Sequence, residues 1–381
     1  MTGAGCLILG AGLSGKAAGE LCAELGFSHV TLDAGDDVPA EDFAFAVVSP
    51  GIPPDHAWVH ECRRRGIPCK SELQFGCEEL RRRGWKLLGV TGSKGKSSVV
   101  KITADAINLA GGRAVACGNY GYPVSKVACD RGEPGWAVVE VSSFMMETTS
   151  LPADAFAAAA VLNLQEDHLD RHGSVENYHS LKLKLLRMSV NGFIASPGEV
   201  PAGSYFDNEI LRAGGAAAVS LMRTAGVGEA DIEKAFNSFK PLEHRMQEVA
   251  VIDGVRFVDD SKATSLAALR AGVVMCGSRV RLIAGGQSKG DDPLSVVADL
   301  TGRVKKVYLI GRCAEDFFEA WSGKVDCEIC GTLERAVGMS MRQAEAGDTV
   351  VLSPGAASYD QFRNFGERGD VFASLVNKKG K

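Results

Sequence analysis

A glycine-rich run near residue 95 has the residue types of a phosphate-binding loop. It reads Thr91-Gly92-Ser93-Lys94-Gly95-Lys96-Ser97-Ser98 and stands between an apolar segment and a helical pattern. In such a loop backbone N–H groups surround phosphates, Lys96 reaches the terminal phosphate, and the hydroxyl of Ser97 binds magnesium. The strict GxxxxGK[ST] spacing fails, because Val90 stands where the first glycine belongs. The strand, the Gly-Lys-Ser triplet and the helix together still predict an ATP site.

A second glycine-rich run lies at the start of the chain. Gly10-Ala11-Gly12-Leu13-Ser14-Gly15 follows an apolar strand and opens a helix, as a GxGxxG loop requires. Glycines let the backbone approach a diphosphate, and the helix N-terminus supplies oriented N–H groups. Asp33 closes the next strand, near the spacing at which an acidic residue binds ribose hydroxyls. The pattern predicts a nucleotide or its diphosphate. An NAD-dependent dehydrogenase and a purely structural turn are the alternatives.

Three side chains of the middle segment have the chemistry of a metal site near a bound triphosphate. Glu140 ends one apolar strand, and His168 follows the next. The ends of neighbouring parallel strands meet at one edge of a sheet, so both would lie near the phosphate loop. Carboxylate oxygen suits Mg²⁺ better than imidazole nitrogen, so Glu140 ranks above His168 on chemistry alone. Lys182 shares a helix face with Tyr178, and taken alone it has the pattern of a solvated helix lysine.

These residues need elements that bring them together, and a pattern of apolar strand, glycine turn and amphipathic helix recurs along the chain. Strand patterns occupy residues 6–9, 29–32, 43–48, 85–90, 136–141, 157–163, 255–258, 280–283, 306–310 and 349–352, and helix patterns include 213–223 and 230–239. Such alternation predicts parallel sheets with ligands at the carboxyl ends of the strands. We expect an α/β protein of three domains. These are a Rossmann-like domain over residues 1–85, an ATPase-like domain with a mostly parallel sheet over 86–241, and a second Rossmann-like domain over 242–381.

The composition excludes several classes of protein. The chain has 381 residues, of which 45% are hydrophobic and 23% charged, as in globular proteins and unlike disordered or fibrous ones. The longest apolar run, Ala155–Leu162, is too short for a membrane span, and no secretory leader is visible. The net charge of −5 argues against a nucleic-acid surface, and eleven scattered cysteines suggest reduced thiols. We therefore expect a monomeric cytoplasmic protein without nucleic-acid or membrane partners.

Other side chains that bind metals elsewhere have ordinary interpretations here. Cys327 and Cys330 form a CxxC with no second pair, which fits two reduced core thiols better than a zinc site. His172, His179 and His244 stand outside any motif, and we interpret them as surface or hinge residues without an assigned role.

The order of the motifs resembles that of the Mur ligases. The matching runs are Gly10–Gly15, Ser49-Pro50-Gly51-Ile52, Thr91–Ser98, Gly118-Asn119-Tyr120-Gly121, Glu140–Phe144, Asp167–Arg171, Asp259-Asp260-Ser261-Lys262-Ala263-Thr264, Gly285–Gly290 and Ser353–Asp370. Within the family, the Asp-Ser-Lys-Ala-Thr run and Ser358–Phe365 resemble the members that add D-glutamate. The resemblance implies an ATP-dependent amide ligase of peptidoglycan synthesis. Such an enzyme phosphorylates the L-alanyl carboxylate of UDP-N-acetylmuramoyl-L-alanine and then joins D-glutamate to the acyl phosphate.

The resemblance also implies roles for individual residues. The UDP substrate would contact Gly12, Leu13, Ser14, Asp33, Ser49, Pro50, Gly51, Asn119 and Ser142. ATP would contact Gly92, Ser93, Lys94, Gly95, Lys96, Ser97 and Ser98, together with Arg245, Asp260 and Lys262. One magnesium would lie at Ser97 and Glu140, and a second at His168 and a carbamylated Lys182. D-Glutamate would contact Thr264, Lys289, Ser358 and Phe365, and the catalytic residues would be Lys96, Glu140, His168 and Lys182.

The chain departs from the family in its middle segment, which is short between residues 187 and 230. The asparagine motif that contacts adenine in the family falls here on residues 210–214. Leu211 and Gly214 have no side chain that can form a hydrogen bond, and Asn208 lies outside this register. Two alternatives therefore stay open: another Mur-type or folate ligase, and a catalytically weak or inactive protein that binds nucleotide and UDP-sugar.

Overall fold

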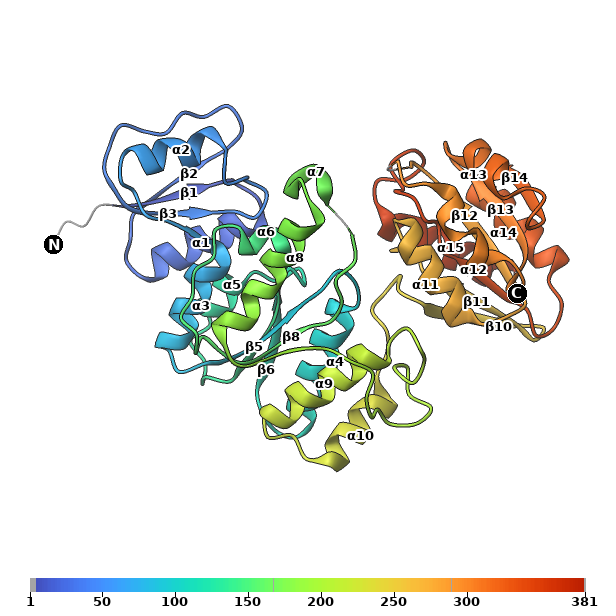
Figure 1. Cartoon of the computed structure of the whole chain (residues 1–381), viewed down its shortest axis with the longest axis horizontal. Coiled ribbons are helices and arrows are strands. Elements are labelled where there is room, and N and C mark those ends of the chain that lie inside the picture. The colour runs from blue at the N-terminus through green and yellow to red at the C-terminus, as the bar shows by residue number, and fades with distance from the viewer. Residues whose placement is uncertain (1–4, 167, 289, 380–381) are drawn as a thin grey trace. The chain divides into compact units, whose positions relative to one another are not determined.

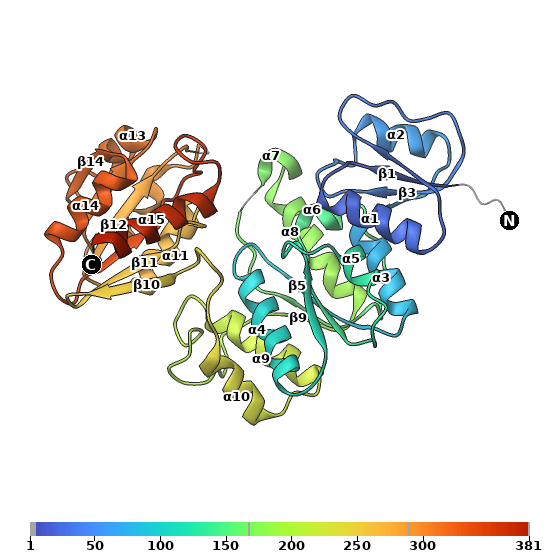
Figure 2. The same cartoon turned by 180° about the vertical axis from the view of Figure 1, so that it is seen from behind.

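The structure, a computed structural model, describes residues 5–166, 168–288 and 290–379 (Figures 1 and 2). It contains two compact units, one ending at Phe239 and the other starting at Lys240. Both units are built from strands that alternate with helices, so the predicted α/β class is confirmed. No helix among the described residues is long and apolar enough to cross a lipid bilayer.

The first unit contains two sheets, and the N-terminal residues form the smaller one. Its four parallel strands lie in the order β2-β1-β3-β4. Leu9 pairs with Leu32 of β2 and with Val48 of β3, so the carboxyl ends of these three strands meet at one edge. The elements are β1 Gly5–Leu9, α1 Leu13–Glu24, β2 His29–Leu32, β3 Phe43–Val48, α2 Ala57–Arg64, β4 Cys69–Ser71 and α3 Glu72–Arg82.

The second sheet of this unit has five parallel strands in the order β6-β7-β5-β8-β9. Its central strands are buried apolar runs, as expected where helices cover both faces of a parallel sheet. The elements are β5 Lys86–Thr91, α4 Lys96–Leu109, β6 Ala114–Gly118, α5 Val124–Ala128, β7 Trp136–Glu140, α6 Ser143–Met146, β8 Phe156–Val161, α7 Leu169–His172, α8 Val175–Leu183, the 3₁₀ helix η1 Lys184–Met188, β9 Ser189–Ile194, α9 Arg212–Thr224 and α10 Glu229–Ser238.

A shared core explains why both sheets belong to one unit. Leu21 of α1 and Leu80 of α3 pack in the same apolar cluster as Leu87 and Val139 of the second sheet. The opposite face of the second sheet packs on α4, α9 and α10, and Figure 1 shows α4 and α9 side by side over it. Loops follow the carboxyl ends of the strands in each sheet.

The second unit is a six-stranded sheet in the order β10-β11-β15-β12-β13-β14. All neighbours are parallel except β10 and β11, which form an antiparallel hairpin. Its turn is Asp253-Gly254, where φ is +50° and +76°, as a two-residue hairpin turn requires. The elements are β10 Gln247–Ile252, β11 Val255–Asp259, α11 Leu266–Cys276, β12 Val280–Gly285, η2 Pro293–Val296, α12 Val297–Leu300, β13 Val304–Ile310, α13 Ala314–Trp321, β14 Cys327–Gly331, α14 Leu333–Gln343, β15 Thr349–Leu352 and α15 Phe365–Lys379.

The strand patterns of the sequence correspond to ten strands of the structure, within one or two residues at their ends. Five further strands, β4, β6, β9, β10 and β14, were not predicted. All five lie at sheet edges, where a strand has a neighbour on one side only and the apolar pattern is weak. The division into domains over residues 1–85, 86–241 and 242–381 stays a prediction.

Candidate active site

The run from Thr91 to Ser98 forms a loop between β5 and α4 at the carboxyl edge of the five-stranded sheet. Gly92 (φ +149°) is required here, because a Cβ would lie 3.0 Å from the Leu162 Cβ and 3.2 Å from the Asn163 nitrogen. Asn163, just after β8, accepts a hydrogen bond from the Lys94 N–H at 2.9 Å and donates one to the Lys94 carbonyl at 3.0 Å. Gly95 precedes α4 and offers no capping side chain. The loop is therefore fixed in shape, with a helix N-terminus aimed at its interior.

Lys96 folds back over this loop. Its Nζ donates to the carbonyls of Gly92 and Ser93, at 2.9 and 3.1 Å. The ammonium therefore lies over the turn into which phosphates would fit, and Ser97 and Ser98 follow it as buried residues of the first helical turn. The predicted ATP residues from 92 to 98 all belong to this one structure.

Glu140 has the property expected of a metal ligand. It ends β7 and pairs in register with Val90 of β5, so it lies beside the phosphate loop. Its side chain is buried, and Oε1 accepts a hydrogen bond from Asn119 Nδ2 at 3.0 Å. Oε2 is also buried and has no hydrogen-bond partner among the described residues. A buried carboxylate oxygen without a donor is costly, and a divalent cation would remove that cost.

Lys182 corrects the interpretation of a solvated helix lysine. The side chain is 2% exposed, and its Nζ donates to the Gly92 carbonyl at 2.9 Å. Nζ also lies 4.4 Å from the centre of the Tyr178 ring, and the Tyr178 hydroxyl is 3.1 Å from Ser93 Oγ. Helix α8 therefore turns its Tyr178–Lys182 face toward the phosphate loop. An unmodified ammonium cannot bind a cation, so this lysine fits a metal site only in its carbamylated form.

His168 lies at the entrance of the same region. It is exposed, adopts a left-handed backbone (φ +54°), and its ring centre is 4.9 Å from that of Phe144 and 6.2 Å from that of Tyr178. Among the described residues, no cluster of three or more His, Cys, Asp or Glu side chains could hold a metal. Magnesium characteristically takes only one or two carboxylates and completes its shell with water and phosphate oxygens. The residues present therefore fit magnesium bound together with a nucleotide.

The residues predicted to contact the UDP substrate lie mainly at the carboxyl edge of the smaller sheet. Gly15 allows a very close turn, since a Cβ there would lie 1.8 Å from the Gly10 carbonyl oxygen. Ser49 Oγ donates to the same carbonyl at 3.2 Å, which ties the loop after β3 to the loop after β1. Leu13 is 73% exposed, and Asp33 Oδ1 accepts from the Ala34 N–H at 2.8 Å. Gly12, Pro50 and Gly51 belong to these loops and Ser14 to the first turn of α1, whereas Asn119 and Ser142 lie shortly after β6 and β7 of the larger sheet.

In the second unit, two buried aspartates lie at the end of β11, Asp259 as its last residue and Asp260 directly after it. Asp260 Oδ2 accepts from Ser353 Oγ at 2.8 Å and Oδ1 from the Met246 N–H at 3.3 Å. Burial raises the pKa of Asp260 to about 7. Burial likewise raises the pKa of Asp259, although His244 Nδ1 lies 2.7 Å from its Oδ2. His244, interpreted from the sequence as a surface or hinge residue, is thus a partner of a buried carboxylate.

Lys262, Thr264, Ser358 and Phe365 lie around the same edge of that sheet. Lys262 Nζ is 3.7 Å from the centre of the Phe365 ring, and Ser261 Oγ donates to the Phe365 carbonyl at 2.8 Å. Ser358 is buried after β15. Arg245 precedes β10 in this unit, whereas the predicted D-glutamate contact Lys289, like Asp167 of the His168 run, lies outside the described residues.

Arg368 is a buried residue of the same edge that sequence reasoning did not single out. It is 1% exposed, and its Nε and Nη2 donate to Ser261 Oγ at 3.0 Å and to the Ser261 carbonyl at 2.9 Å. Nη2 also donates to the Ala356 carbonyl at 3.1 Å, and burial lowers the pKa of Arg368 to about 10. Nη1 is buried without a partner among the described residues and faces Gly286, where a Cβ would be 3.2 Å away. The only sequence signal was its place within the run Ser353–Asp370.

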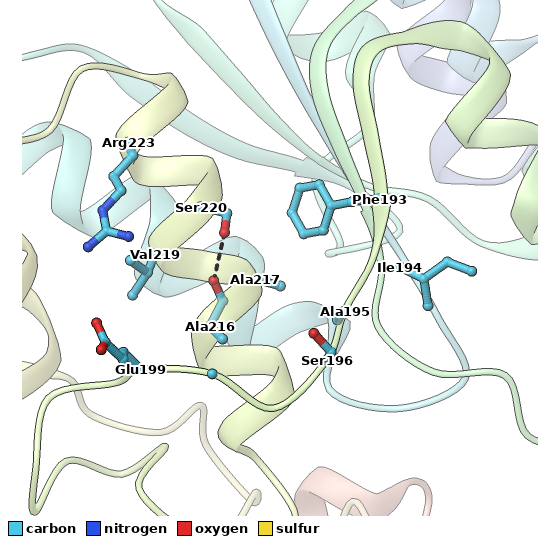
Figure 3. A pocket seen from close by; sticks show the side chains of 11 residues that line it. Phe193, Ile194, Ala195, Ser196, Glu199, Ala216, Ala217, Val219, Ser220 and Arg223 are labelled. Atoms are coloured by element: carbon cyan, nitrogen blue, oxygen red, sulfur yellow. Dashed lines mark hydrogen bonds between the residues drawn. The ribbon is translucent and has the colours of Figure 1, made fainter.

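A separate hollow of 270 Å³ lies between the end of β9 and helix α9 (Figure 3). In that view Glu199 and Arg223 lie on one side and Phe193 on the other. None of the predicted site residues lines it. Nearby, Asn208 Oδ1 accepts from the N–H groups of Ile210 and Leu211, at 3.1 and 3.0 Å, so its side chain supports the turn into α9.

Comparison with known proteins decides the family. The Mur ligase middle domain matches residues 90–238, and the Mur ligase glutamate ligase domain matches residues 244–355. The chain is 32% identical to the UDP-N-acetylmuramoylalanine–D-glutamate ligase of Chlamydia caviae, with 97% of each chain covered. The chain belongs to the Mur ligase family. It is also 34% identical to the protein of that name from Gloeobacter violaceus, over 97% of this chain and 98% of the relative.

The solved structures agree with this family at the level of the fold. The UDP-N-acetylmuramate-alanine ligase MurC from Thermotoga maritima has a TM-score of 0.60 and 13% identity, over 99% of this chain and 100% of that chain. The matched middle domain of the Mur ligase family includes Lys96, Glu140, His168 and Lys182. Ser358, Phe365 and Arg368 lie beyond the matched glutamate ligase domain.

Proposed function

We propose that this Mur ligase joins D-glutamate to UDP-N-acetylmuramoyl-L-alanine at the expense of ATP, in the synthesis of peptidoglycan precursors. The observation that carries the chemistry is the buried pair of Glu140 and Lys182 beside the phosphate loop. The substrates rest on the relatives of that name, which match nearly the full chain at 32% and 34% identity.

In the proposed reaction the terminal phosphoryl group of ATP moves to the L-alanyl carboxylate, and its bond to ADP breaks. The amine of D-glutamate then attacks the acyl carbon, the new C–N bond forms, and phosphate leaves with the acyl oxygen. Lys96 would neutralise charge on the phosphates while the loop amides orient them. Magnesium would supply further neutralisation, held by Ser97 and Glu140 at one site and by His168 and a carbamylated Lys182 at a second.

The smaller sheet would bind the UDP portion through Gly12, Leu13, Ser14, Asp33, Ser49, Pro50 and Gly51, with Asn119 and Ser142 contributing from the larger sheet. The second unit would bind D-glutamate through Thr264, Lys289, Ser358 and Phe365, and ATP through Arg245, Asp260 and Lys262. Arg368 would hold this edge in shape, because it connects Ser261 with Ala356. The three domain ranges follow the same assignment: UDP substrate, ATP and amino acid.

A protein that binds nucleotide without turnover is the second candidate, and one observation favours it. Asn208 supports a turn, and Leu211 and Gly214 offer no side-chain hydrogen bond, so the family's contact with adenine has no equivalent there. This alternative predicts that the protein binds nucleotide and catalyses no reaction. A monomer in the cytoplasm without nucleic-acid partners stays a prediction.

Phosphate release separates these candidates. The protein is mixed with ATP, magnesium and UDP-N-acetylmuramoyl-L-alanine, and D-glutamate, L-glutamate or no amino acid is added. Release that requires D-glutamate, together with an amide product of matching mass, supports the ligase. No release in any mixture, with the UDP substrate still bound, supports the inactive protein instead.

Two matched lysine variants test the phosphate loop itself. Lys96→Ala removes the ammonium over the loop and should lower kcat by about 10²–10³-fold, the usual cost of losing one group that stabilises transition-state charge. Lys101→Ala is the control on the same helix, because Lys101 pairs with Asp105 on the surface. Equal losses for both variants would mean that the loop is not where the phosphoryl group is transferred.

A further inference from the structure

A buried arginine–glutamate pair joins two short helices of the first unit. Glu147 directly follows α6, and Arg171 belongs to α7. Arg171 donates to both carboxylate oxygens, with Nε at 3.1 Å and Nη2 at 2.6 Å, and the side chains are only 19% and 8% exposed. A forked contact of this kind fixes the orientation of both side chains, which a single lysine contact does not.

His172 packs beside the same carboxylate, although its Nδ1 has no hydrogen-bond partner among the described residues. Its Nδ1 lies 3.3 Å from Glu147 Oε1, and its Nε2 lies 3.0 Å from Ser143 Oγ at the start of α6. The order serine, histidine, glutamate is that of a nucleophile with its base and acid. Here Ser143 is 2% exposed and the His172 side chain fully buried, so no substrate reaches them. Burial also lowers the pKa of His172, which keeps the ring neutral. The trio therefore serves to hold α6 and α7 together.

The pair also reaches the smaller sheet. Arg171 Nη1 lies 3.5 Å from the Gly51 carbonyl and Nη2 lies 3.4 Å from the Pro50 carbonyl. These contacts are long, but they come from the only guanidinium that the described residues place against both carbonyls. A hollow of 540 Å³, lined by Pro53, Pro54 and Asp55 as well as Glu147 and Arg171, opens beside them. Arg171, which lies in the helix that follows His168, thus contacts both the loop after β3 and Glu147 just after α6.

The segments joined in this way carry three separate parts of the proposed site. The Ser49–Gly51 loop is assigned to the UDP substrate, the end of β7 carries Glu140, and His168 directly precedes α7. Phe144, two residues before the end of α6, lies 4.9 Å from the His168 ring and 5.2 Å from the Arg171 guanidinium. Figures 1 and 2 both show α6, α7 and α8 gathered at this point.

We propose that Arg171 and Glu147, supported by His172, are positioning residues that couple the UDP-substrate loop to His168. They touch no reacting atom. They set the distance between the carbonyls of residues 50 and 51 and the left-handed turn at His168, so that substrate bound at one is aligned with the other. This inference rests on the proposed function for its kinetic consequences, whereas the coupling between the two segments is a property of the protein alone.

The experiment compares Arg171→Lys with Arg64→Lys as a matched control. Arg64 makes the same forked contact with Glu61, at 2.7 and 2.8 Å, but is 72% exposed, and its carboxylate partner lies on its own helix α2. Hydrogen–deuterium exchange is measured without ligands, together with the thermal midpoint. In Arg171→Lys, exchange should become faster both at residues 49–52 and at residues 168–172, while Arg64→Lys leaves both segments unchanged. Faster exchange confined to residues 168–172 would overturn the coupling, whatever the enzyme does.

Kinetics then distinguish positioning from general damage. In Arg171→Lys, kcat should fall about 10–100-fold, the usual cost of losing a group that orients a ligand-binding residue. KM for the UDP substrate should rise. KM for ATP should stay unchanged, because hydrogen bonds between Asn163 and Lys94 hold the phosphate loop without Arg171. A parallel rise in both KM values with a lower thermal midpoint would contradict the proposal.

A second variant guards against misfolding of the first. Ser143→Ala removes only the hydroxyl that contacts His172, and should speed exchange at residues 168–172 without affecting residues 49–52. Wild-type protein without D-glutamate-dependent phosphate release would refute the proposed function, but the exchange result would still decide the coupling.

Discussion

In the second unit, buried carboxylates lie at both ends of the parallel strands, here called the amino edge and the carboxyl edge of the sheet. The two edges differ in the partners that surround these carboxylates. At the amino edge, just before β15, the Asp348 side chain is fully buried and lies 2.8 Å from Arg279, 2.7 Å from Arg281 and 3.2 Å from Lys305. Burial alone would raise the pKa of Asp348, but hydrogen bonds from Arg281, the Glu345 N–H and Lys305 outweigh it and hold the pKa below its usual value.

At the carboxyl edge the buried ionisable groups have fewer partners. Asp260 is also buried, but its partners are a serine hydroxyl and a backbone N–H, and burial raises its pKa to about 7. Arg368 has a buried Nη1 without a partner among the described residues, within the same part of the sheet. A charge that the protein neutralises by itself stabilises the fold, whereas a charge left short of partners is available to a ligand. The amino edge belongs to the fold and the carboxyl edge to the proposed reaction.

The largest effect is expected when the amino edge is broken. Asp348→Ala leaves Arg281, whose side chain is 8% exposed, without its carboxylate, and should lower the free energy of unfolding by about 3–5 kcal/mol. Urea unfolding measures the loss. Ligase activity per folded molecule should stay unchanged, because no predicted ligand contact lies at this edge.

Asp299→Ala is the control for that prediction. Its partner Arg270 is 60% exposed, so the pair should contribute less than about 1 kcal/mol. If both variants lost the same small amount of unfolding free energy, the charge cluster at Asp348 would stabilise the fold no more than an exposed ion pair. The contrast between the two edges would then disappear.

The next effect is expected on activity, when the carboxyl edge is changed. Asp260→Asn keeps the shape of the side chain, and the Ser353 hydroxyl can accept from the new amide as well as donate. At pH 6, where the Asp260 carboxyl is mostly protonated, the free energy of unfolding should change by less than about 1 kcal/mol. At pH 8, where it is ionised, kcat/KM for ATP should fall roughly 10–100-fold, the worth of one charged hydrogen bond. A stability loss as large as that of Asp348→Ala, with activity intact, would reverse the assignment of the two edges.

The sequence predicted the positions that carry chemistry better than it predicted what surrounds them. Both glycine loops and Glu140 come directly after strongly apolar strands, and local pattern suffices to place them at strand ends. The burial of Lys182 could not be predicted, because helical spacing puts it on one face with Tyr178 but does not say what that face meets. Arg368 contacts Ser261, 107 residues away, and His172 contacts Ser143, 29 residues away, and no local pattern points to either partner.

The missed strand β9 illustrates a second physical limit. Its residues include an exposed Val190 and an exposed Ile194 with Asn191 and Gly192 between them, so neither alternation nor a continuous apolar run is present. The strand exists because its backbone pairs with β8, from Phe156 with Ser189 to Val161 with Ile194. Edge strands of this kind are defined by a neighbour and not by their own sequence.

The contributions of Asp260 and Asp348 to the free energy of unfolding should change with pH in opposite directions. The pKa of Asp260 is about 7 in the folded protein, whereas the unfolded chain releases this proton near the ordinary pKa of 3.8. Between these values the folded state binds more protons, so its stability falls as pH rises, by about 1.4 kcal/mol per pH unit from this group, and levels off above pH 7. For Asp348 the folded pKa is depressed, so its stabilisation is present above about pH 4 and is lost only in acid.

The measurement is urea unfolding at pH 5, 6, 7 and 8 of the wild type, Asp260→Asn and Asp348→Asn. The difference between wild type and Asp260→Asn should change with pH up to 7, while Asp348→Asn should differ from wild type by a nearly constant amount across the series. Parallel curves for wild type and Asp260→Asn would mean that Asp260 is already ionised in the folded protein, and that the carboxyl edge is as well neutralised as the amino edge.

The smallest effect is expected at the hairpin turn of the amino edge. Gly254 has φ +76°, and a Cβ there would lie 3.1 Å from the Ala346 Cβ. Gly254→Ala should cost about 1–2 kcal/mol, because an alanine is strained in the left-handed region. Gly302→Ala is the control, since Gly302 has φ +79° with no atom within 4 Å of the added Cβ. The excess loss at Gly254 measures the contact with Ala346, and kcat should be unchanged in both. A fall in kcat at a stability loss this small would show that the amino edge reaches the reaction, and that the separation of fold and chemistry between the two edges is incomplete.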